Sequence, residues 1–407
     1  MTEPLFQGFL PHVVTAEWAD RVITGAYDAL SPTQRSAIAN SEPYSYLNVT
    51  RSPGDDPDRE LSAEELLAMG RDSLQTLRDA QVFAAPDEPG LVVYRLTLGD
   101  HQQVGVVGLM PVEAALDGRI RKHEDVRPAR TELLARHLEV VGAASSPVAL
   151  THQSDANLNS VVDRVVANPP ALATGAGNVG QEVWILDAAT SGQLQDLLQN
   201  KTFYITDGHH RFAAAAVAAG RHETGSAFHR VLVASFPSEQ LRVLPFHRRV
   251  AHRNDMTVDD LLAALGQVGE IRPLSGIDQA PPPPGEVSIY LANSWHRLTL
   301  SNGDQSQHND AVSGLDVSVL QDAILDPILG ISEPNADPAI EYVADPVGID
   351  ELVRRCDVDG GVAFILAATT IEDIMTVADS NGLMPPKSSY FDPKPRSGVF
   401  LRLLEER

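Results

Sequence analysis

The chain has 407 residues, 43% of them hydrophobic, and is therefore long enough for two or three compact domains with a sizeable core. It carries 55 acidic against 31 basic residues, and this net charge of −24 argues against a broad nucleic-acid interface, which needs a basic surface. The single cysteine, Cys356, excludes an intramolecular disulfide and a thiolate zinc cluster, and it indicates a reducing compartment.

Targeting and membrane signals are not evident in the sequence. The first residues lack a basic segment followed by an apolar one, and no stretch approaches the roughly 18 apolar residues of a membrane span. We therefore expect a cytoplasmic protein with no membrane partner and no nucleic-acid partner.

The first 110 residues predict a region of mixed helices and strands. Ser31-Pro32 is a typical helix start, and the segment Ser62 to Glu65 forms a capping box for the next helix. A strand is predicted over residues 43–51, and the alternation over 91–96 and 103–109 predicts a β-hairpin.

A basic stretch, Gly118 to Arg127, precedes a helix predicted over residues 128–141. Charge runs before helices are most often solvated faces. Alternatively, His123 beside Glu124 offers a donor and a carboxylate, as a general base or a substrate-hydroxyl clamp requires. The cations around them, which could bind phosphates by charge-assisted hydrogen bonds, are Arg121, Lys122 and Arg127.

The central motif is a strand, a tight turn and a helix. An apolar run from Phe203 ends in Asp207-Gly208, and an alanine-rich helix follows as far as Gly220. The turn adds the side chains of His209, His210 and Arg211 to the free N–H groups and positive dipole of a helix N-terminus, which favours a phosphate ligand. Alternatively, Asp207 is only an N-cap and the three basic side chains are solvated.

Two further segments carry candidate anion-binding residues. His247 and Arg248 lie in a basic segment after Leu244-Pro245, where the alternative is an ordinary basic surface. Four prolines between residues 385 and 395 predict an extended loop over 384–394, which is either a clamp for phosphate or carboxylate or a tail strapped over the core. The loop's candidate ligands are Lys387, Ser388, Ser389 and Lys394.

Together these motifs resemble the DUF1015 family, whose Asp-Gly-His-His-Arg turn is similar to a phosphate-binding turn of the ParB nucleotide-binding superfamily. The basic stretch is similar to the family's I-K-x-H-E-x-T element, with Arg121 for lysine and Val126 for threonine. The 384–394 loop is similar to M-P-x-K-S-T-x-F-x-P-K, and Tyr27-Asp28 to a Pro-Tyr-Asp-Val element without its prolines. Because some superfamily members are free-serine kinases, the resemblance implies a phosphoryl-transfer enzyme.

The expected fold is α+β, with a ParB-like nucleotide-binding core. Residues 1–110 would form an N-terminal α/β region, and residues 111–252 the core with the Asp207 turn. Residues 253–407 would form a C-terminal α/β domain whose loop over 384–394 closes over the site.

The expected function is Mg²⁺-dependent transfer of a phosphoryl group from ATP, ADP or CTP to a hydroxyl of a small metabolite such as free serine. Asp207 would bind Mg²⁺, and Gly208 with the three basic residues after it would bind phosphate oxygens. Glu124 or Asp28 would accept the hydroxyl proton.

Two other functions stay open at this point. One is a ParB-like switch that binds CTP or ATP and regulates a partner; the sequence leaves open whether the chain forms a homodimer. The other is a metal-dependent phosphohydrolase with Asp207, His209, His210 and Glu124 as ligands. Adjacent histidines on a helix diverge by about 100°, which argues against both binding one ion.

Overall fold

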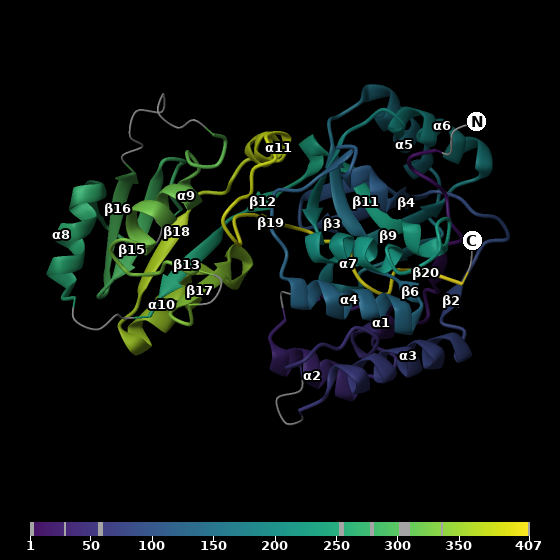
Figure 1. Ribbon diagram of the computed structural model, residues 1–407, viewed down its shortest axis with the longest axis horizontal. Coiled ribbons are helices and arrows are strands. Elements are labelled where there is room, and N and C mark those ends of the chain that lie inside the picture. The colour runs from purple at the N-terminus through teal and green to yellow at the C-terminus, as the bar shows by residue number, and fades with distance from the viewer. Residues whose placement is uncertain are drawn as a thin grey trace. The chain divides into compact units, whose positions relative to one another are not determined.

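The computed structural model describes residues 4–27, 30–55, 60–251, 256–276, 281–300, 310–334 and 337–405 (Figure 1). The chain is a mixed α/β protein with several sheets, and it forms two compact units. The first unit comprises Met1–Arg121, Val126–Leu241 and Pro393–Arg407. The second comprises Lys122–Asp125 and Arg242–Asp392.

An eight-stranded mixed sheet lies at the centre of the first unit. Its strands pair in the order β5 (Ile120–Arg121), β10 (Phe203–Asp207), β7 (Val148–His152), β11 (Arg230–Pro237), β4 (His101–Pro111), β3 (Val92–Leu98), β9 (Gly180–Ile185) and β8 (Leu172–Thr174). The pairs β5–β10 and β7–β11 are parallel, and the other pairs are antiparallel. The predicted hairpin is confirmed as β3 and β4, with Val93 opposite Val106.

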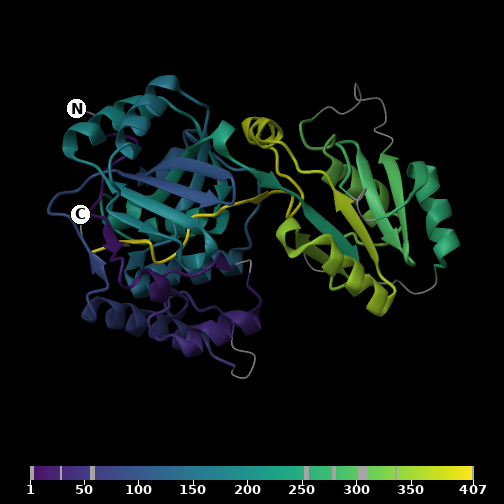
Figure 2. The ribbon, with the colours of Figure 1, turned by 180° about the vertical axis from the view of Figure 1, so that it is seen from behind.

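Both faces of this sheet are buried under side chains. Successive residues of a strand point to opposite faces, so neighbours in β3 pack in different cores. Val93 packs in one core with Leu158, Leu194 and Phe212, which come from the helices α5 (Ala156–Val166), α6 (Ala188–Leu198) and α7 (His209–Ala219). Its neighbour Tyr94 packs in the other core, to which α3 (Ala63–Asp79) contributes. α4 (Pro128–Val141) lies beside α7 and α3, and Figure 2 shows the unit from behind.

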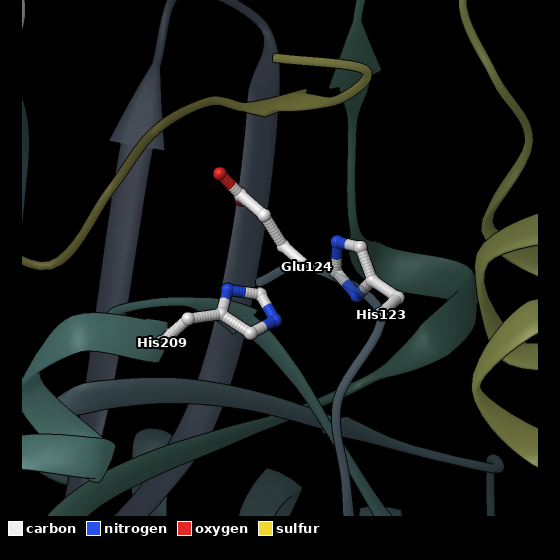
Figure 3. Close-up of side chains that lie close together, drawn as sticks. All are labelled: His123, Glu124 and His209. Carbon is white, nitrogen blue, oxygen red and sulfur yellow. The ribbon is translucent and has the colours of Figure 1, made fainter. Parts of the chain in front are cut away.

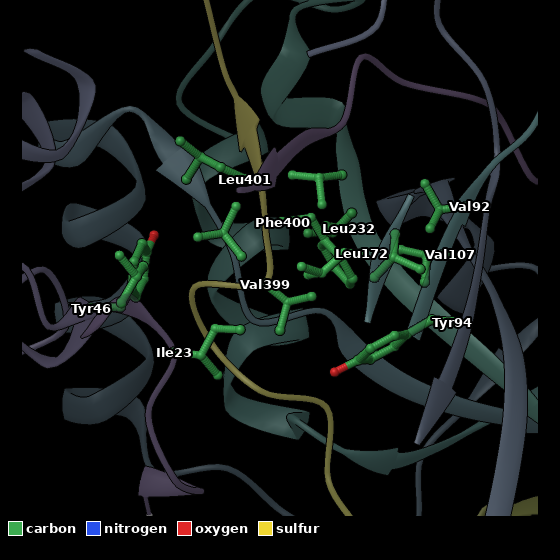
Figure 4. Close-up of a cluster of buried hydrophobic side chains, with 14 of the residues drawn as sticks. Ile23, Tyr46, Val92, Tyr94, Val107, Leu172, Leu232, Val399, Phe400 and Leu401 are labelled. Carbon is green, nitrogen blue, oxygen red and sulfur yellow. The ribbon is translucent and has the colours of Figure 1, made fainter. Parts of the chain in front are cut away.

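A four-stranded sheet joins both ends of the chain in the first unit. Its order is β2 (Phe83–Ala84), β1 (His12–Val14), β20 (Phe400–Leu403) and β6 (Ala143–Ala144). β20, the last strand of the chain, brings Phe400 against Tyr94, with ring centroids 5.3 Å apart (Figure 4). The residues after the 384–394 loop are therefore part of the first unit's core.

The N-terminal helices confirm two predictions and contradict a third. The helix predicted to start at Ser31-Pro32 is α2 (Pro32–Ser41), and the capping box predicted at Ser62 is present at the start of α3. The strand predicted over 43–51 is wrong, since the segment contains the 3₁₀-helix η2 (Tyr46–Asn48). Ser45 caps this turn, and the Asn48 amide donates to the carbonyl oxygens of Ala39 and Glu42, so polar contacts override the apolar pattern.

The second unit is built on a six-stranded antiparallel sheet. Its order is β14 (Gly269–Leu274), β16 (Ser294–Leu300), β15 (Glu286–Leu291), β18 (Val362–Leu366), β13 (Phe246–Val250) and β17 (Ile340–Ala344). One face packs against α8 (Val258–Val268), α9 (Asp316–Leu320) and the π-helical turn η9 (Gln321–Leu325), and the other against α10 (Ile349–Asp359). The unit also contains α11 (Ile371–Asp379) and the pair β12 (Val243–Leu244) and β19 (Tyr390–Phe391).

Short helical elements complete the described chain. They are α1 (Ala19–Val22), η3 (Val112–Ala115), η4 (Ala176–Asn178), η5 (Ala227–His229), η6 (Ser238–Gln240) and η10 (Asp345–Val347). None of the helices in the described ranges is long and apolar enough to cross a membrane.

The three regions expected from the sequence differ from the two units. The boundary expected after residue 110 lies inside β4, which pairs with β11 up to Pro111. The boundary expected after residue 252 follows β13, which already belongs to the sheet of the second unit. Strand pairing between residues far apart in the sequence places β4 and β13 in their sheets. A local change in composition gives no sign of such pairing.

Candidate anion-binding site

The strand, turn and helix predicted around Asp207 are present in the first unit. Phe203 and Ile205 of β10 are buried in the sheet, and Gly208 ends the strand with a φ of 96°, in the left-handed region that favours glycine. α7 then begins at His209, whose ring Figure 3 shows at the first turn. The face of α7 toward α4 carries small side chains, among them Ala214 and Ala218, so the two helices pack closely.

Arg211 folds back over Gly208. A Cβ at Gly208 would lie 2.8 Å from Arg211 Nη2, so the close approach of the guanidinium requires glycine there. Arg211 Nη1 donates to the carbonyl oxygen of Pro147 at 2.6 Å, and Nη2 donates to Asp207 Oδ2. The guanidinium is thus held on the turn at two points.

Asp207 is the centre of a three-residue charge cluster. Besides Arg211, it contacts Lys394, whose Nζ lies 2.8 Å from Asp207 Oδ1. Burial acts to raise the pKa of Asp207, but the charges of Lys394 and Arg211 outweigh it and lower the pKa well below its usual value. The carboxylate is therefore ionised at neutral pH.

Lys394 reaches Asp207 because the segment Pro393 to Gly398, which we call the C-terminal strap, is fixed to the first unit. Gln103 Nε2 donates to the Pro393 carbonyl oxygen at 3.1 Å, and the Gly398 N–H donates to Ser145 Oγ at 2.7 Å. The hydroxyls of Ser397 and Ser146 also form a hydrogen bond. The strap therefore leads from Lys394, which pairs with Asp207, to the start of β20.

Arg396 is a residue of the strap that the sequence analysis missed. Only 7% of it is exposed, and neither Nε nor Nη1 donates a hydrogen bond to any residue in the described ranges. A buried guanidinium with two nitrogens that lack partners is costly, so Arg396 is a candidate ligand for an anion. The sequence feature that could have indicated Arg396 is its position two residues after Lys394, in the same proline-rich segment.

The histidines of the turn have different surroundings. His210 Nε2 accepts the backbone N–H of Arg127 at 2.9 Å, so this nitrogen carries no proton and Nδ1 carries it instead. A metal-ligand role for His210 through Nε2 would break this bond. His209 is buried. Arg121 lies beside Tyr204 in the parallel pair β5–β10, and its Nε donates to the Gly118 carbonyl oxygen at 3.2 Å.

Lys122, His123 and Glu124 belong to the second unit. Lys122 is exposed, Glu124 is half-buried, and both His123 and Glu124 are labelled in Figure 3. His123 is buried, and its carbonyl oxygen accepts the N–H of Met384 at 2.8 Å. The segment is thus hydrogen-bonded to the start of the 384–394 loop. Asp28 lies outside the described residues.

His247 and Arg248 also lie in the second unit, on β13, and both are buried. His247 Nδ1 accepts the Leu366 N–H at 3.4 Å, and Nε2 lies 3.2 Å from Asp345 Oδ1. Arg248 donates to the carbonyl oxygens of Lys387 (2.9 Å) and Pro386 (3.2 Å), and burial lowers its pKa to about 10. These contacts hold the 384–394 loop.

The remaining loop residues are bound within the second unit in different ways. Lys387 Nζ lies 5.1 Å from the ring centroid of Phe246, at a distance that allows a cation–π contact. Ser388 Oγ donates to the Pro385 carbonyl oxygen at 2.6 Å, and Ser389 is half-buried. That the 384–394 loop with Lys387 closes over the Asp207 site stays a prediction. The structure brings together Asp207, Gly208, Arg211 and Lys394 within one unit.

Gly208→Ala tests the fit of Arg211 over the turn. An alanine in the left-handed conformation costs about 1–2 kcal/mol, and its Cβ would displace the guanidinium of Arg211. Gly99→Ala is the matched control, because Gly99 also has a positive φ, of 61°, but nothing within 4 Å of the added Cβ. We expect both variants to lose stability in denaturant unfolding and only Gly208→Ala to lose nucleotide affinity. Equal affinity in both would contradict an anion site at this turn.

Comparison with known proteins gives a family, and solved structures that are similar at low identity and low TM-score. SbnI with a C-terminal truncation, from Staphylococcus aureus, is 13% identical with a TM-score of 0.39 over 73% of this chain and 87% of that chain. A free serine kinase in complex with AMP is 14% identical with a TM-score of 0.35 over 77% and 96%. No curated protein matches the sequence. The family model described as "Protein of unknown function (DUF1015)" matches residues 6–318, and the chain therefore belongs to this family.

Proposed function

We propose that the protein is a Mg²⁺-dependent kinase that transfers a phosphoryl group from a nucleotide to a hydroxyl of a small metabolite, with free serine as the first acceptor to test. The observation that carries the proposal is the convergence of Arg211 and Lys394 on Asp207 at the N-terminus of the 11-residue helix α7. In this proposal, β10, the turn and α7 are the ParB-like phosphate-binding core.

The geometry supports phosphate binding for two reasons. The first turn of α7 presents backbone N–H groups and the positive end of the helix dipole. Arg211 and Lys394 add two cations beside the turn, and Arg396 of the same strap carries a buried guanidinium whose Nε and Nη1 have no partner among the described residues. Phosphoryl transfer depends mainly on positioning and on neutralising phosphate charge, which these groups supply.

Asp207 is also suited to hold Mg²⁺, because it is ionised and a carboxylate is a ligand that Mg²⁺ prefers. The two cations beside it oppose the binding of a bare ion. In our proposal, Asp207 would hold the ion, and Lys394 and Arg211 would donate hydrogen bonds to the nucleotide phosphates. Mg²⁺ would neutralise phosphate charge there, and it should bind with the nucleotide and not before it.

The proton acceptor in this proposal is Glu124, with His123 beside it and Asp28 as the other candidate. Glu124→Gln keeps the shape and removes the charge, so kcat should fall about 10² to 10⁴-fold while nucleotide affinity changes by a factor of a few. Asp125→Asn, a change of an exposed neighbour, is the control and should leave kcat unaltered.

The outcome also separates the two carboxylates. If Asp28→Asn lowers kcat and Glu124→Gln does not, the two roles are exchanged. If neither variant lowers kcat, the kinase proposal is wrong.

The deciding experiment is ³¹P NMR of the protein with ATP, ADP or CTP, Mg²⁺ and a panel of amino acids and small alcohols. A new phosphomonoester resonance that requires both the acceptor and the protein would establish the kinase. Inorganic phosphate alone, released with or without an acceptor, would indicate a phosphohydrolase. Nucleotide binding and nucleotide-dependent dimerisation without either product would indicate a regulatory switch.

A further inference from the structure

The first unit contains a cavity of about 140 Å³, which we call the arginine cavity. Its walls are mostly apolar and come from α3, α4, α7, β6, β11 and β20. The apolar lining includes Leu66, Leu67, Leu133, Leu134, Leu138 and Ala144. A cavity of such size and lining takes a compact apolar group, since an apolar cavity of ~150 Å³ is enough to bind benzene.

The charged lining of the arginine cavity has one sign. Arg51, Arg211, Arg230 and Arg402 contribute to it, and no aspartate or glutamate does among the lining residues that the structure describes. This local excess of arginines contrasts with the whole chain, which has 55 acidic and 31 basic residues. His137 also lines the cavity, where burial lowers its pKa and keeps it neutral at pH 7. The lining therefore carries positive charge that favours an anion, although Arg211 is already paired with Asp207, which does not line the cavity.

Arg402 is the lining residue best placed to hold that anion. It is 5% exposed, and it donates to the carbonyl oxygens of Arg230 at 2.5 Å and Ala227 at 2.6 Å. No carboxylate in the described part of the chain pairs with it, and burial, aided by the charge of Arg230, lowers its pKa to about 10. A buried cation next to a like charge is destabilising, and a bound anion would relieve this.

We propose that the arginine cavity binds a small monocarboxylate with an apolar body, with the carboxylate on Arg402 and the body among the leucines of α3 and α4. A guanidinium matches the planar carboxylate with two parallel hydrogen bonds, and the apolar wall excludes a second charged group. An aromatic or branched aliphatic acid of about eight heavy atoms has the size that the cavity accepts. This proposal does not depend on the kinase activity.

Ligand-detected NMR with matched acids and amides tests the charge requirement. Benzoate and 4-methylpentanoate should bind the full chain at least about tenfold more tightly than benzamide and 4-methylpentanamide, because only the acids form charge-assisted bonds. Arg402→Met should remove this preference.

A second pair of variants tests the place of binding without removing a charge. Ala144 lies directly opposite Arg402 in the β6–β20 register, so Ala144→Leu extends into the space beside the guanidinium. It should weaken benzoate binding at least about tenfold. Ala173→Leu, an equal change at an exposed position of β8 outside the cavity, should not.

Three results would overturn the proposal. Equal affinities for the acids and their amides would show that the arginines do not select an anion. Unchanged benzoate binding by Ala144→Leu would place the ligand elsewhere. Displacement of benzoate by ADP would make the cavity part of a nucleotide site instead of a separate one.

Discussion

Asp207→Asn is expected to lower kcat by about 10² to 10⁴-fold, measured by ³¹P NMR as phosphomonoester formed per minute. The substitution removes the charge that orders Arg211 and Lys394, and it removes the proposed Mg²⁺ ligand, so phosphate charge is neutralised less well in the transition state. Unchanged turnover would exclude Asp207 from the catalytic machinery.

The same variant has an expected pH signature. Because the folded-state pKa of Asp207 is lowered, its ion pairs stabilise the fold above the ordinary aspartate pKa of ~3.9, and this stability is lost as pH falls through the folded-state value. The free energy of unfolding should therefore fall less between pH 5 and pH 2, a window of about three units, in Asp207→Asn than in the unchanged protein. Asp155→Asn is the matched control, since Lys201 pairs with Asp155 at 2.6 Å and lowers its pKa. It should alter the acid stability and leave kcat unchanged.

The features that could be predicted from the sequence are those that local chemistry decides. Gly208 and the alanines after it specify a left-handed turn and a helix over a few residues, and the structure has both. The capping box at Ser62 is equally local. The segment 43–51 was mispredicted because the side chain of Asn48 bonds to backbone groups earlier in the chain, and an apolar pattern does not encode such contacts.

The candidate site could be predicted only in part. The sequence predicts that the 384–394 loop closes over the Asp207 turn, but the ion pair of Lys394 with Asp207 is not predicted, since two residues 187 positions apart give no sign of a direct contact. Arg248 illustrates the opposite case: its charge suggested an anion ligand, yet its N–H groups hold loop carbonyls. The hydrogen bonds that a buried guanidinium already makes decide whether it is available to a ligand, and residue type alone does not report them.

Arg396→Met is expected to change stability and binding in opposite directions. Methionine fills a similar volume without a buried guanidinium whose Nε and Nη1 lack partners, so the free energy of unfolding without nucleotide should rise by about 1–3 kcal/mol. If Arg396 binds phosphate, the same change should weaken nucleotide binding by about 1.5–3 kcal/mol, or roughly 10- to 100-fold in Kd. Denaturant unfolding and nucleotide titration measure the two effects on one preparation.

Arg35→Met provides the contrast that makes this result interpretable. Arg35 is a half-buried arginine of the first unit, but its Nε lies 2.8 Å from Asp55 Oδ1, and the side chains are only 13% and 8% exposed. Removing it leaves a carboxylate without its cation, so stability should fall, by up to about 3–5 kcal/mol, with nucleotide affinity unchanged. If Arg396→Met instead behaves like Arg35→Met, its guanidinium stabilises the strap, and the anion site is then limited to the Asp207 turn and Lys394. If Arg396→Met gains stability and loses nucleotide affinity, Arg396 destabilises the free protein and contributes to nucleotide binding.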